Sequence, residues 1–366
     1  MEVVVRGFAE ATSRAFSNYC LVATRTGETR VEKRGPTTLH FLRQAGTFLL
    51  APVLPSLPWT LHRLRREESF DVILLHYPNP TAILALFLSL LVRPKREKIV
   101  IWHHADILLE ERWKRAIYAL YRPVEEFVFR RTDRFLGATP HHVPRSPVFS
   151  RFADRSGIIP YAVPDSWFRI GEKEAGAGEA VRREIGGPYI LFVGRLVPYK
   201  GLDTLLRAAG GIPYRIVIVG TGPLESSIRS EIVSRGLEGK VILAGKVAEL
   251  RPYFLGCDAL VLPSRSALEG FGIVQIEAMA LGKPVVSSDL PTGVTYVNVD
   301  GETGLVFPVG DAEALASACR RLQAEDELRF RLGDAARRRT MELFSYTAME
   351  RRAASVLGDL VGGKPG

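Results

Sequence analysis

Cysteine is scarce in this sequence. The 366 residues include only three, Cys20, Cys257 and Cys319, which lie far apart in the chain. An odd number at such spacing matches neither a disulfide framework nor a zinc site, and it is typical of a protein from a reducing compartment. The chain must therefore be stabilised by apolar burial, for which its 46% hydrophobic content suffices. Its length favours two domains over one or three.

Long hydrophobic runs are also missing. The longest candidate, AILALFLSLLV at 82–92, has 11 residues, whereas a membrane-spanning helix needs roughly 18. It suits a buried helix that follows a strand. The apolar segment 46–61 is interrupted by Pro52, Pro55 and Pro58, and no basic stretch with a cleavage site marks a signal peptide. We expect a cytoplasmic protein that meets a membrane, if at all, only peripherally at the inner face of the cell membrane.

Acidic residues are relatively few in the first half of the chain. Residues 1–165 carry 24 Lys and Arg against 16 Asp and Glu, a net charge of +8, while residues 166–366 carry 25 and 24. A basic first half suggests an anionic partner, either a nucleic acid or a membrane surface. No zinc finger or aromatic RNA-binding strand is recognisable, so we expect no nucleic acid and a peripheral contact with an anionic membrane.

Apolar strand-like runs alternate with helical stretches throughout the chain. Strands are expected at 18–26, 70–78, 98–104, 134–140, 189–195, 214–222, 240–247, 258–264 and 283–289. Because most of these runs are apolar along their whole length, they indicate parallel sheets covered on both faces, which is the α/β class. Two such units in series predict two Rossmann-like domains.

Composition suggests where the domains begin and end. We predict a first domain at 1–165, a linker at 166–188 that is rich in Gly, Glu and Ala, and a second domain at 189–343. The C-terminal residues 344–366 include an amphipathic helix, which we expect to pack back toward the first domain.

The N-terminus departs from the usual doubly wound domain, which opens with a strand and a Gly-rich turn. Here Val4, Phe8, Ala11 and Ala15 have helical spacing and precede the strand at 18–26. We therefore expect the first strand of the N-terminal domain to be missing, through either a misassigned start or a truncation.

Two glycines after the strand at 214–222 raise a dinucleotide-binding alternative. Gly220 and Gly222 follow the strand, but the third glycine of G-x-G-x-x-G is replaced by Glu225. The next strand does not end in an acidic residue either. The pattern disfavours hydride transfer, and a tight strand-to-helix turn is a sufficient explanation of the glycines.

The segment GRLVPYKG (194–201) places positive charge at the end of a strand. Gly194 ends the strand, Arg195 is expected to point out of its carboxyl end, and Lys200 lies at the start of the next helix. Ligands of open α/β sheets bind at this edge. A guanidinium that grips oxygens in pairs and an ammonium point charge suit the two phosphates of a diphosphate.

The segment EGFGIVQIE (269–277) adds a second group to the same edge. The turn that leads into the helix consists of Gly270, Phe271, Gly272 and Ile273. It exposes backbone amides and the N-terminus of the helix to an anion. Glu269 precedes the helix, and Glu277 lies about two turns into it. Carboxylates at the two ends can accept hydrogen bonds from the sugar and ribose hydroxyls of a sugar nucleotide, with the diphosphate between them.

Taken together, these segments resemble retaining glycosyltransferases of the GT-B fold, family 4 (glycosyl transferases group 1). The E-x7-E motif of that family matches Glu269 and Glu277, and its G-R-x(4)-K-G element matches 194–201. The resemblance covers nearly the whole chain and also includes GTGPLE (220–225), EAMALGKPVV (277–286) and GETGLVFPVGD (301–311). It implies that Arg195 and Lys200 bind the donor diphosphate, that Glu269 contacts the transferred sugar and that Glu277 contacts the ribose.

Three further segments narrow the resemblance to a bacterial subgroup that transfers mannose from GDP-mannose to lipid-linked oligosaccharides. They are HYPNP (76–80), IWHHADI (101–107) and LPTGVTYVN (290–298). The subgroup has a Trp-His-Ser-Asp segment after a strand, and the corresponding segment here is one residue longer. The resemblance implies a catalytic histidine near the reacting sugar, either His103, which we favour, or His104.

The function expected from the sequence is a retaining, metal-independent transfer of a hexose to a lipid-linked or polysaccharide-precursor acceptor. Mannose from GDP-mannose is the preferred donor. No two aspartates stand two apart, so the Asp-x-Asp metal site of another transferase fold is missing, and neither a metal nor a cofactor beyond the nucleotide sugar is expected. Two alternatives stay open: a UDP-sugar-dependent enzyme of the same family, and a truncated, non-catalytic nucleotide-sugar binder.

Overall fold

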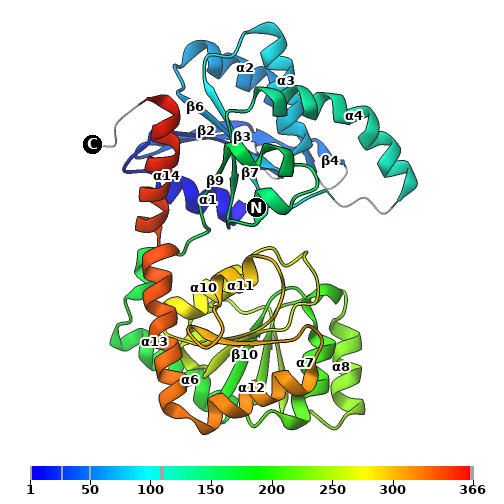
Figure 1. The fold of residues 1–366 in the computed structure, drawn as a ribbon, viewed down its shortest axis with the longest axis vertical. Helices are drawn as coiled ribbons and strands as arrows, with labels where there is room; N and C mark the ends of the chain where they lie inside the picture. The colour runs from blue at the N-terminus through cyan, green and yellow to red at the C-terminus, as the bar shows by residue number, and fades with distance from the viewer. Residues whose placement is uncertain (1, 26–27, 49–50, 108–110, 363–366) are drawn as a thin grey trace. The chain divides into compact units, whose positions relative to one another are not determined.

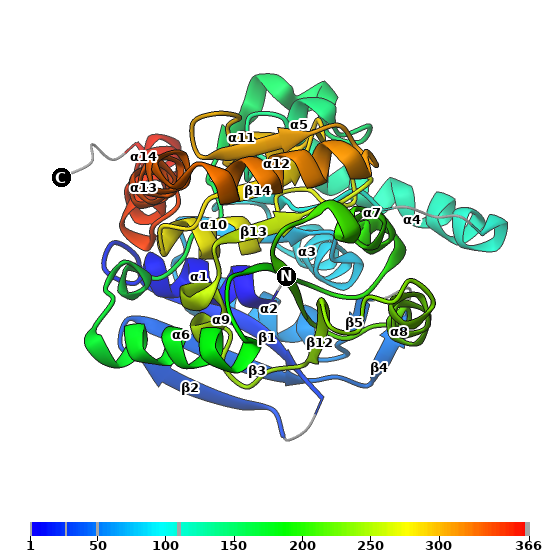
Figure 2. The same ribbon diagram turned by 90° about the horizontal axis from the view of Figure 1, so that it is seen from below.

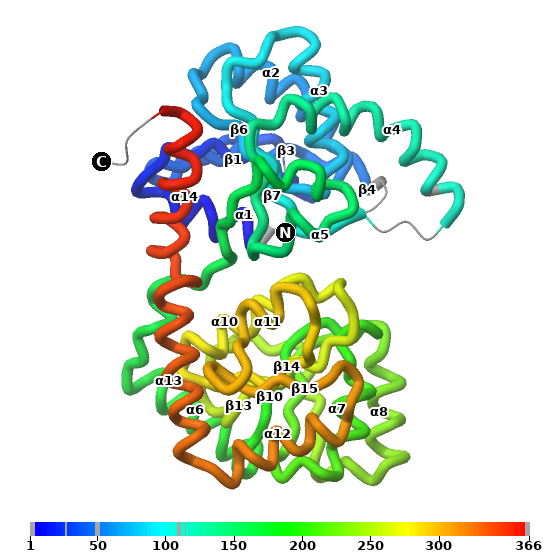
Figure 3. The backbone as a smooth tube through the Cα atoms, viewed as in Figure 1, coloured from blue at the N-terminus to red at the C-terminus, as the bar shows by residue number. Residues whose placement is uncertain are grey.

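The computed structural model describes residues 2–25, 28–48, 51–107 and 111–362. The chain forms two compact units (Figure 1). Unit 1 comprises Met1–Pro160 and Met349–Gly366, and unit 2 comprises Tyr161–Ala348. The polypeptide therefore passes between the units twice, as the tube in Figure 3 shows.

Unit 1 is built on two sheets. Strands β6 to β9 form a four-stranded parallel sheet in the order β6-β7-β8-β9, and a three-stranded sheet has the order β1-β3-β2. In the smaller sheet β1 is parallel and β2 antiparallel to β3, and β4 and β5 form a separate hairpin. The strands are β1 Asn18–Thr24, β2 Arg30–Arg34, β3 Thr37–Arg43, β4 Gly46–Phe48, β5 Ala51–Val53, β6 Val72–Tyr77, β7 Lys98–His103, β8 Arg134–Gly137 and β9 Ser156–Ile158.

The helices of unit 1 connect these strands. The first described element is helix α1, as the helical spacing at the N-terminus predicted. The helices are α1 Glu2–Ala11, α2 Leu57–Glu67, α3 Pro80–Val92, α4 Arg112–Arg131, α5 His142–Arg145 and the 3-10 helix η1 Ser150–Arg155. Residues of α14 from Met349 onward also belong to this unit, and Val356 lies against Gly157 of β9.

Helix α3 is apolar on both its inner and its outer face. Ile83, Leu86 and Leu90 are buried in one core with strand residues of β6 and β7, as expected for a helix that follows a strand. The prediction of a buried helix holds only for this inner face, because Leu84 and Leu88 are exposed on the opposite side. The sequence of an apolar helix does not show which of its sides is buried, since every position carries the same kind of side chain.

Unit 2 is a six-stranded parallel sheet in the order β12-β11-β10-β13-β14-β15. Strands at the five positions predicted for this half are confirmed, and β15 adds a sixth. The strands are β10 Tyr189–Val193, β11 Arg215–Val219, β12 Val241–Gly245, β13 Ala259–Leu262, β14 Val285–Ser288 and β15 Gly304–Phe307. All residues of β10 and β13 are buried, which explains why these runs are apolar throughout.

Helices flank the sheet of unit 2, as Figure 2 shows in a view from below. They are α6 Glu172–Ile185, α7 Leu202–Ala208, α8 Glu225–Ser234, α9 Arg251–Gly256, α10 Ile273–Ala280, α11 Gly293–Val297, α12 Ala312–Ala324 and α13 Asp326–Leu343. Helix α14, Tyr346–Val361, begins in unit 2 and belongs to unit 1 from Met349 onward. Short 3-10 helices are η2 Asp165–Phe168, η3 Pro198–Lys200 and η4 Ala209–Gly211. None of the helices in the described ranges combines the length and the apolar character that crossing a bilayer requires.

The segment predicted as a linker at 166–188 contains helix α6 instead of irregular chain. The helix was not predicted because its small residues weaken the apolar pattern. In the structure these small residues allow the helix to pack closely on its neighbour. Gly178 lies so close to α9 that a methyl group there would meet the backbone at Gly256. Arg182 also forms an ion pair with Asp258 at 2.8 Å. Contacts with α9, rather than an amphipathic pattern, hold α6 in place.

Candidate functional site

The predicted donor residues of unit 2 gather at one edge of its sheet. Strands β10 and β13 are parallel neighbours, so the segments that follow them emerge side by side. Lys200 ends η3, which follows β10, and Glu269 follows β13. Ligands of open parallel sheets bind at this carboxyl edge. The structure therefore brings together two residues that lie 69 positions apart in the sequence.

A buried ion pair joins these two residues. Lys200 Nζ lies 2.5 Å from Glu269 Oε2, and both residues are almost fully buried. Ser264 Oγ donates a second hydrogen bond to the same oxygen at 2.8 Å. Glu269 Oε1 accepts no hydrogen bond from the described residues. The carboxylate is thus fixed through one oxygen, while the other is available to a ligand hydroxyl.

The Gly-Phe-Gly turn leads from this pair into helix α10. Thr292 Oγ1 donates to the Glu269 carbonyl at 2.8 Å, and the Gly293 amide donates to the Gly270 carbonyl at 2.8 Å. Gly272 is the N-cap of α10 with a φ of 71°, and a side chain there would collide with Leu262. Only glycine fits this position.

Phe271 and Ile273 flank that glycine and fix the turn. The Phe271 ring is buried against Tyr161, with ring centroids 4.9 Å apart. Its carbonyl accepts a hydrogen bond from Gln275 at 2.9 Å. Ile273 is the first residue of α10. The sequence prediction of a turn that opens a helix at this place is therefore confirmed.

Glu277 lies on helix α10, on its second turn. The side chain is partly exposed, and it makes no ion pair and no hydrogen bond with the described residues. Burial raises the pKa of Glu277 to about 7. A carboxyl group in an apolar helix without a protein partner is costly. It is also suited to accept hydrogen bonds from a ligand.

Arg195 and Gly194 follow strand β10. Arg195 is exposed and makes no ion pair within the described part of the chain. The Lys200 side chain passes Gly194, where an added methyl group would lie 3.4 Å from Lys200 Cε. Gly201, with a φ of 70°, packs so closely that a side chain would overlap the Pro263 carbonyl. Lys200 is partly neutralised by Glu269, so Arg195 is the cation of the pair that remains free for an anion.

In unit 1, His103 is the last residue of β7 and is almost completely buried. Its Nε2 lies 3.2 Å from Asp106 Oδ1, which accepts a hydrogen bond from Ser146 at 2.5 Å. The imidazole also packs edge to face on Phe149, with ring centroids 5.0 Å apart. The side chain favoured by the sequence is therefore enclosed by other side chains of its own unit.

His104 comes directly after the strand and is only partly buried. Its Nε2 shares a hydrogen bond with His76 Nδ1 at 2.8 Å, and the two rings are nearly parallel to each other. Burial lowers the pKa of His76 to about 4 and also lowers that of His104 well below its ordinary value. Both imidazoles are therefore neutral at physiological pH, with one donating to the other.

Sequence reasoning missed the residues that hold these side chains. Ser264 was present in the PS dipeptide before EGFG, and His76 in HYPNP, but neither spacing indicated a partner. Asp106 stood in the quoted IWHHADI segment without a role. Ser146 lies 40 positions from the aspartate it contacts, so no local signal could have found it.

Comparisons with known proteins agree with this architecture. Residues 180–339 match the family described as glycosyl transferases group 1, and residues 1–160 match the glycosyl transferase 4-like domain. O-antigen chain mannosyltransferase C of Escherichia coli is 31% identical over 81% of this chain and 78% of the relative. D-rhamnosyltransferase WbpZ of Pseudomonas aeruginosa is 33% identical over 75% of this chain and 70% of the relative.

A solved structure shows the same fold. HepE of Anabaena, crystallised in complex with UDP, superposes with a TM-score of 0.75 at 17% identity, covering 98% of this chain and 96% of its own. Two Rossmann-like units and these neighbours define the GT-B architecture. The chain belongs to the glycosyl transferase group 1 family and is a glycosyltransferase.

Proposed function

We propose that this glycosyltransferase moves mannose from GDP-mannose, with retention of configuration and without a metal, to a lipid-linked or polysaccharide-precursor acceptor. The name of one relative, O-antigen chain mannosyltransferase C, supports the sugar and the acceptor class, whereas the D-rhamnosyltransferase is named for a different sugar. The observation that carries the proposal is the buried Lys200–Glu269–Ser264 group beside the N-terminus of α10.

This group suits a nucleotide sugar along its whole length. Arg195, Lys200 and the amides at the start of α10 would hold the diphosphate, whose negative charge they offset. Glu277 would accept hydrogen bonds from the ribose hydroxyls. The free oxygen of Glu269 would accept from a hydroxyl of the transferred sugar. Each role uses an atom that the described residues leave available, except that Lys200 must share its charge between Glu269 and the phosphate.

The histidine near the reacting sugar is His104 in this proposal. His103 is enclosed, and its Nε2 lies 3.2 Å from Asp106 Oδ1. His104 is partly exposed and is held by His76 through its Nε2. In this proposal a hydroxyl of the transferred sugar lies beside the exposed part of the His104 ring. A neutral imidazole can donate there without carrying charge into the site.

The chemical step is a transfer on one face of the sugar. The acceptor hydroxyl oxygen forms the new bond to the anomeric carbon on the face that the diphosphate leaves. The bond between that carbon and the phosphate oxygen breaks, and the departing phosphate takes the hydroxyl proton. Positive charge and helix amides stabilise the leaving diphosphate, which is the largest contribution expected of such a site. No enzyme nucleophile is required.

A second candidate donor is a UDP-sugar, which the UDP-bound structure of HepE favours. Residues that select the base of a nucleotide through backbone atoms leave no pattern in side-chain chemistry.

The deciding measurement is thermal unfolding of the full chain with GDP, GDP-mannose, UDP, UDP-glucose or UDP-N-acetylglucosamine. We expect stabilisation by the two guanine compounds, reduced in Glu277→Ala. Stabilisation by the uracil compounds alone would show that the donor is a UDP-sugar rather than GDP-mannose. The glycosyltransferase activity of the family would still hold. Binding of GDP-mannose without transfer of mannose to any lipid-linked or polysaccharide acceptor would contradict the proposed acceptor class.

The proposed location of the reaction follows from the acceptor. A lipid-linked saccharide is anchored in a bilayer, so the enzyme would work cytoplasmically at the inner face of the cell membrane. The basic composition of residues 1–165 is consistent with a peripheral contact with anionic lipid.

A further inference from the structure

Exposed apolar side chains concentrate on three neighbouring helices of unit 1. On α2, Trp59 is 75% exposed, on α3 Val92 is 72% exposed, and on α4 Leu120 is 83% exposed. Single exposed apolar residues are ordinary, whereas a group of them on adjacent elements marks an interaction surface. We name this surface the apolar ridge; it consists of Trp59, Leu84, Leu88, Leu91, Val92 and Leu120.

The ridge is continuous along α3. Leu84, Leu88 and Leu91 are spaced four and three residues apart, so they lie on one helix face. That face is opposite to Ile83 and Leu90, which are buried in the core of the unit. Helix α3 contains no charged residue. Its outer surface is therefore as apolar as its inner one.

Helix α4 extends the ridge sideways. Phe127 of α4 packs edge to face on Phe87 of α3, with ring centroids 4.9 Å apart. Leu120 lies two helical turns before Phe127 and hence on the same, α3-facing side of α4. Tyr121 fixes this arrangement, because its hydroxyl donates to the Pro80 carbonyl at 3.0 Å at the start of α3. Leu120 precedes Tyr121 directly, so it belongs to the part of α4 that lies near the start of α3.

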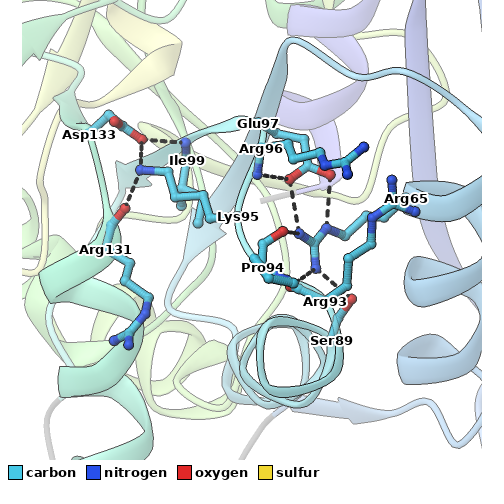
Figure 4. Close-up of polar contacts among 10 residues, drawn as sticks. All are labelled: Arg65, Ser89, Arg93, Pro94, Lys95, Arg96, Glu97, Ile99, Arg131 and Asp133. Atoms are coloured by element: carbon cyan, nitrogen blue, oxygen red, sulfur yellow. Dashed lines mark hydrogen bonds and ion pairs between the residues drawn. The ribbon is translucent and has the colours of Figure 1, made fainter.

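Helix α2 borders the other side of α3 through a buried ion pair. Arg65 lies 2.9 Å from Glu97 and donates to Ser89 of α3 at 2.8 Å (Figure 4). Trp59 is nearly two turns earlier on α2, on its outward side, where 75% of the side chain is exposed. The three helices are therefore fixed to one another, and their outer faces form one surface.

Positive charge surrounds the ridge. Helix α4 carries six Lys and Arg against two Glu, of which Glu125 is buried and Glu126 is paired with Arg130. Arg93 and Arg96 follow the C-terminal end of α3, and neither forms an ion pair in the described parts of the chain. Figure 4 shows the guanidinium group of Arg131, at the end of α4, directed away from the Arg65–Glu97 pair.

We propose that the apolar ridge of α2, α3 and α4 docks on an anionic bilayer surface, with the leucines and Trp59 entering the headgroup region and the arginines contacting anionic lipid. Apolar residues flanked by Lys and Arg define interfacial binding, and tryptophan prefers that depth. The ridge itself is uncharged, and basic residues outnumber acidic ones on the helix α4 that borders it, so charge complementarity favours anionic lipid over a protein partner. The inference rests on the proposed lipid-linked acceptor and names the surface that reaches it.

The test is co-sedimentation of the full chain with vesicles of equal parts phosphatidylcholine and phosphatidylglycerol. The variant Trp59→Ser/Val92→Ser/Leu120→Ser changes only highly exposed side chains, so folding is preserved. We expect its partitioning to fall at least about tenfold. The matched control is Val233→Ser/Phe330→Ser, which removes two exposed apolar side chains of unit 2 and should bind like the wild type. Identical thermal unfolding of all three proteins verifies folding.

Charge is tested separately with Arg93→Gln/Arg96→Gln. Each neutralised arginine should weaken binding to the anionic vesicles about fivefold, and added salt should weaken wild-type binding further. Binding to pure phosphatidylcholine should not change in this variant. Equal affinity of the variant and the wild type for anionic vesicles would show that these two arginines do not contact anionic lipid.

Three results would overturn the proposal. They are a wild type that fails to sediment at low salt, a ridge variant that sediments like the wild type, and a wild-type dimer that the ridge variant converts to a monomer. The last would assign the ridge to a second copy of the chain. Nucleotide stabilisation measured on the same samples separates this inference from the proposed function, whose failure would leave vesicle binding intact.

Discussion

Lys200, through its ion pair with Glu269, is expected to contribute both to the stability of the fold and to turnover. Removing one partner of a buried ion pair leaves an uncompensated charge, so Lys200→Ala should lower the free energy of unfolding by about 3 kcal/mol. It should also lower turnover at least about a hundredfold, because a cation at the leaving phosphate is lost. Denaturant unfolding and initial-rate assays measure the two effects.

A double variant separates the two roles of Lys200. In Lys200→Ala/Glu269→Ala no buried charge remains unpaired, so most of the lost stability should return. Turnover should stay low in the double variant. Recovery of turnover together with stability would mean that Lys200 acts only through folding, and the donor-binding role would have to be abandoned.

Glu277 should make donor binding depend on pH. Its pKa of about 7 means that the carboxylate, which accepts hydrogen bonds through both oxygens, forms only as the pH rises through neutrality. Affinity for the donor should therefore increase between pH about 6 and 8. The variant Glu277→Gln should bind more weakly and lose this dependence. Calorimetric titration across that range checks both statements, and an unchanged pH profile in the variant would contradict them.

At the scale of a helix, α4 contains a buried acid whose ionisation opposes folding. Tyr118 donates to Glu125 Oε2 at 2.5 Å, while burial raises the pKa of Glu125 to about 7. Because the folded state holds this proton more tightly than the unfolded chain, stability is greatest below the ordinary glutamate pKa. It falls as the pH rises through about 7, by on the order of 3 kcal/mol.

The variant Glu125→Gln should remove that loss, because the amide keeps the hydrogen bond from Tyr118 and cannot ionise. Its melting temperature should exceed that of the wild type at pH about 8 and approach it at pH about 5. Glu126→Gln is the matched control on the same helix. Hydrogen bonding to Arg130 lowers the pKa of Glu126, so its neutralisation should not stabilise the protein at high pH. Parallel behaviour of the two variants would refute the assignment to Glu125.

At the scale of the whole molecule, the two units differ in how the chain builds them. Unit 2 is one continuous stretch, Tyr161–Ala348, whereas unit 1 needs the C-terminal residues from Met349 onward. Within that C-terminal segment, the side chains of Met349, Ala353 and Leu357 are buried. A fragment of residues 161–348 should therefore unfold cooperatively and be stabilised by the nucleotide that stabilises the full chain.

A fragment of residues 1–160 should behave differently, because it exposes the apolar surface that α14 covers. It should unfold at a lower temperature than the same fragment with residues 349–362 attached through a flexible linker. Circular dichroism of the two fragments on heating provides the comparison. Equal melting temperatures would show that α14 contributes nothing to unit 1.

Much of this protein could be predicted from local pattern. Apolar runs correctly marked the buried parallel strands, because a strand covered on both faces requires apolar side chains at every position. Helix α6 was not predicted because Gly178 and its small neighbours give no amphipathic pattern and act only through contact with α9. The exposure of the outer face of α3 was not predicted for the opposite reason, since a uniformly apolar helix does not show which of its sides is covered.

Local patterns were enough to predict the fold class, the GT-B resemblance and the residue types at the carboxyl edge of the second sheet. Spacing within a segment sets which residues share a turn or a helix, so Glu269, Gly272 and Glu277 were identifiable. The folded chain was needed to show that Lys200 is neutralised by Glu269, that His103 faces Asp106 and that His104 is held by His76. Most of these contacts join residues far apart in sequence, and even His103 and Asp106, three positions apart, depend on how β7 and the loop after it fold. The physical reason is that burial and pairing depend on what packs against a side chain, which local sequence does not encode.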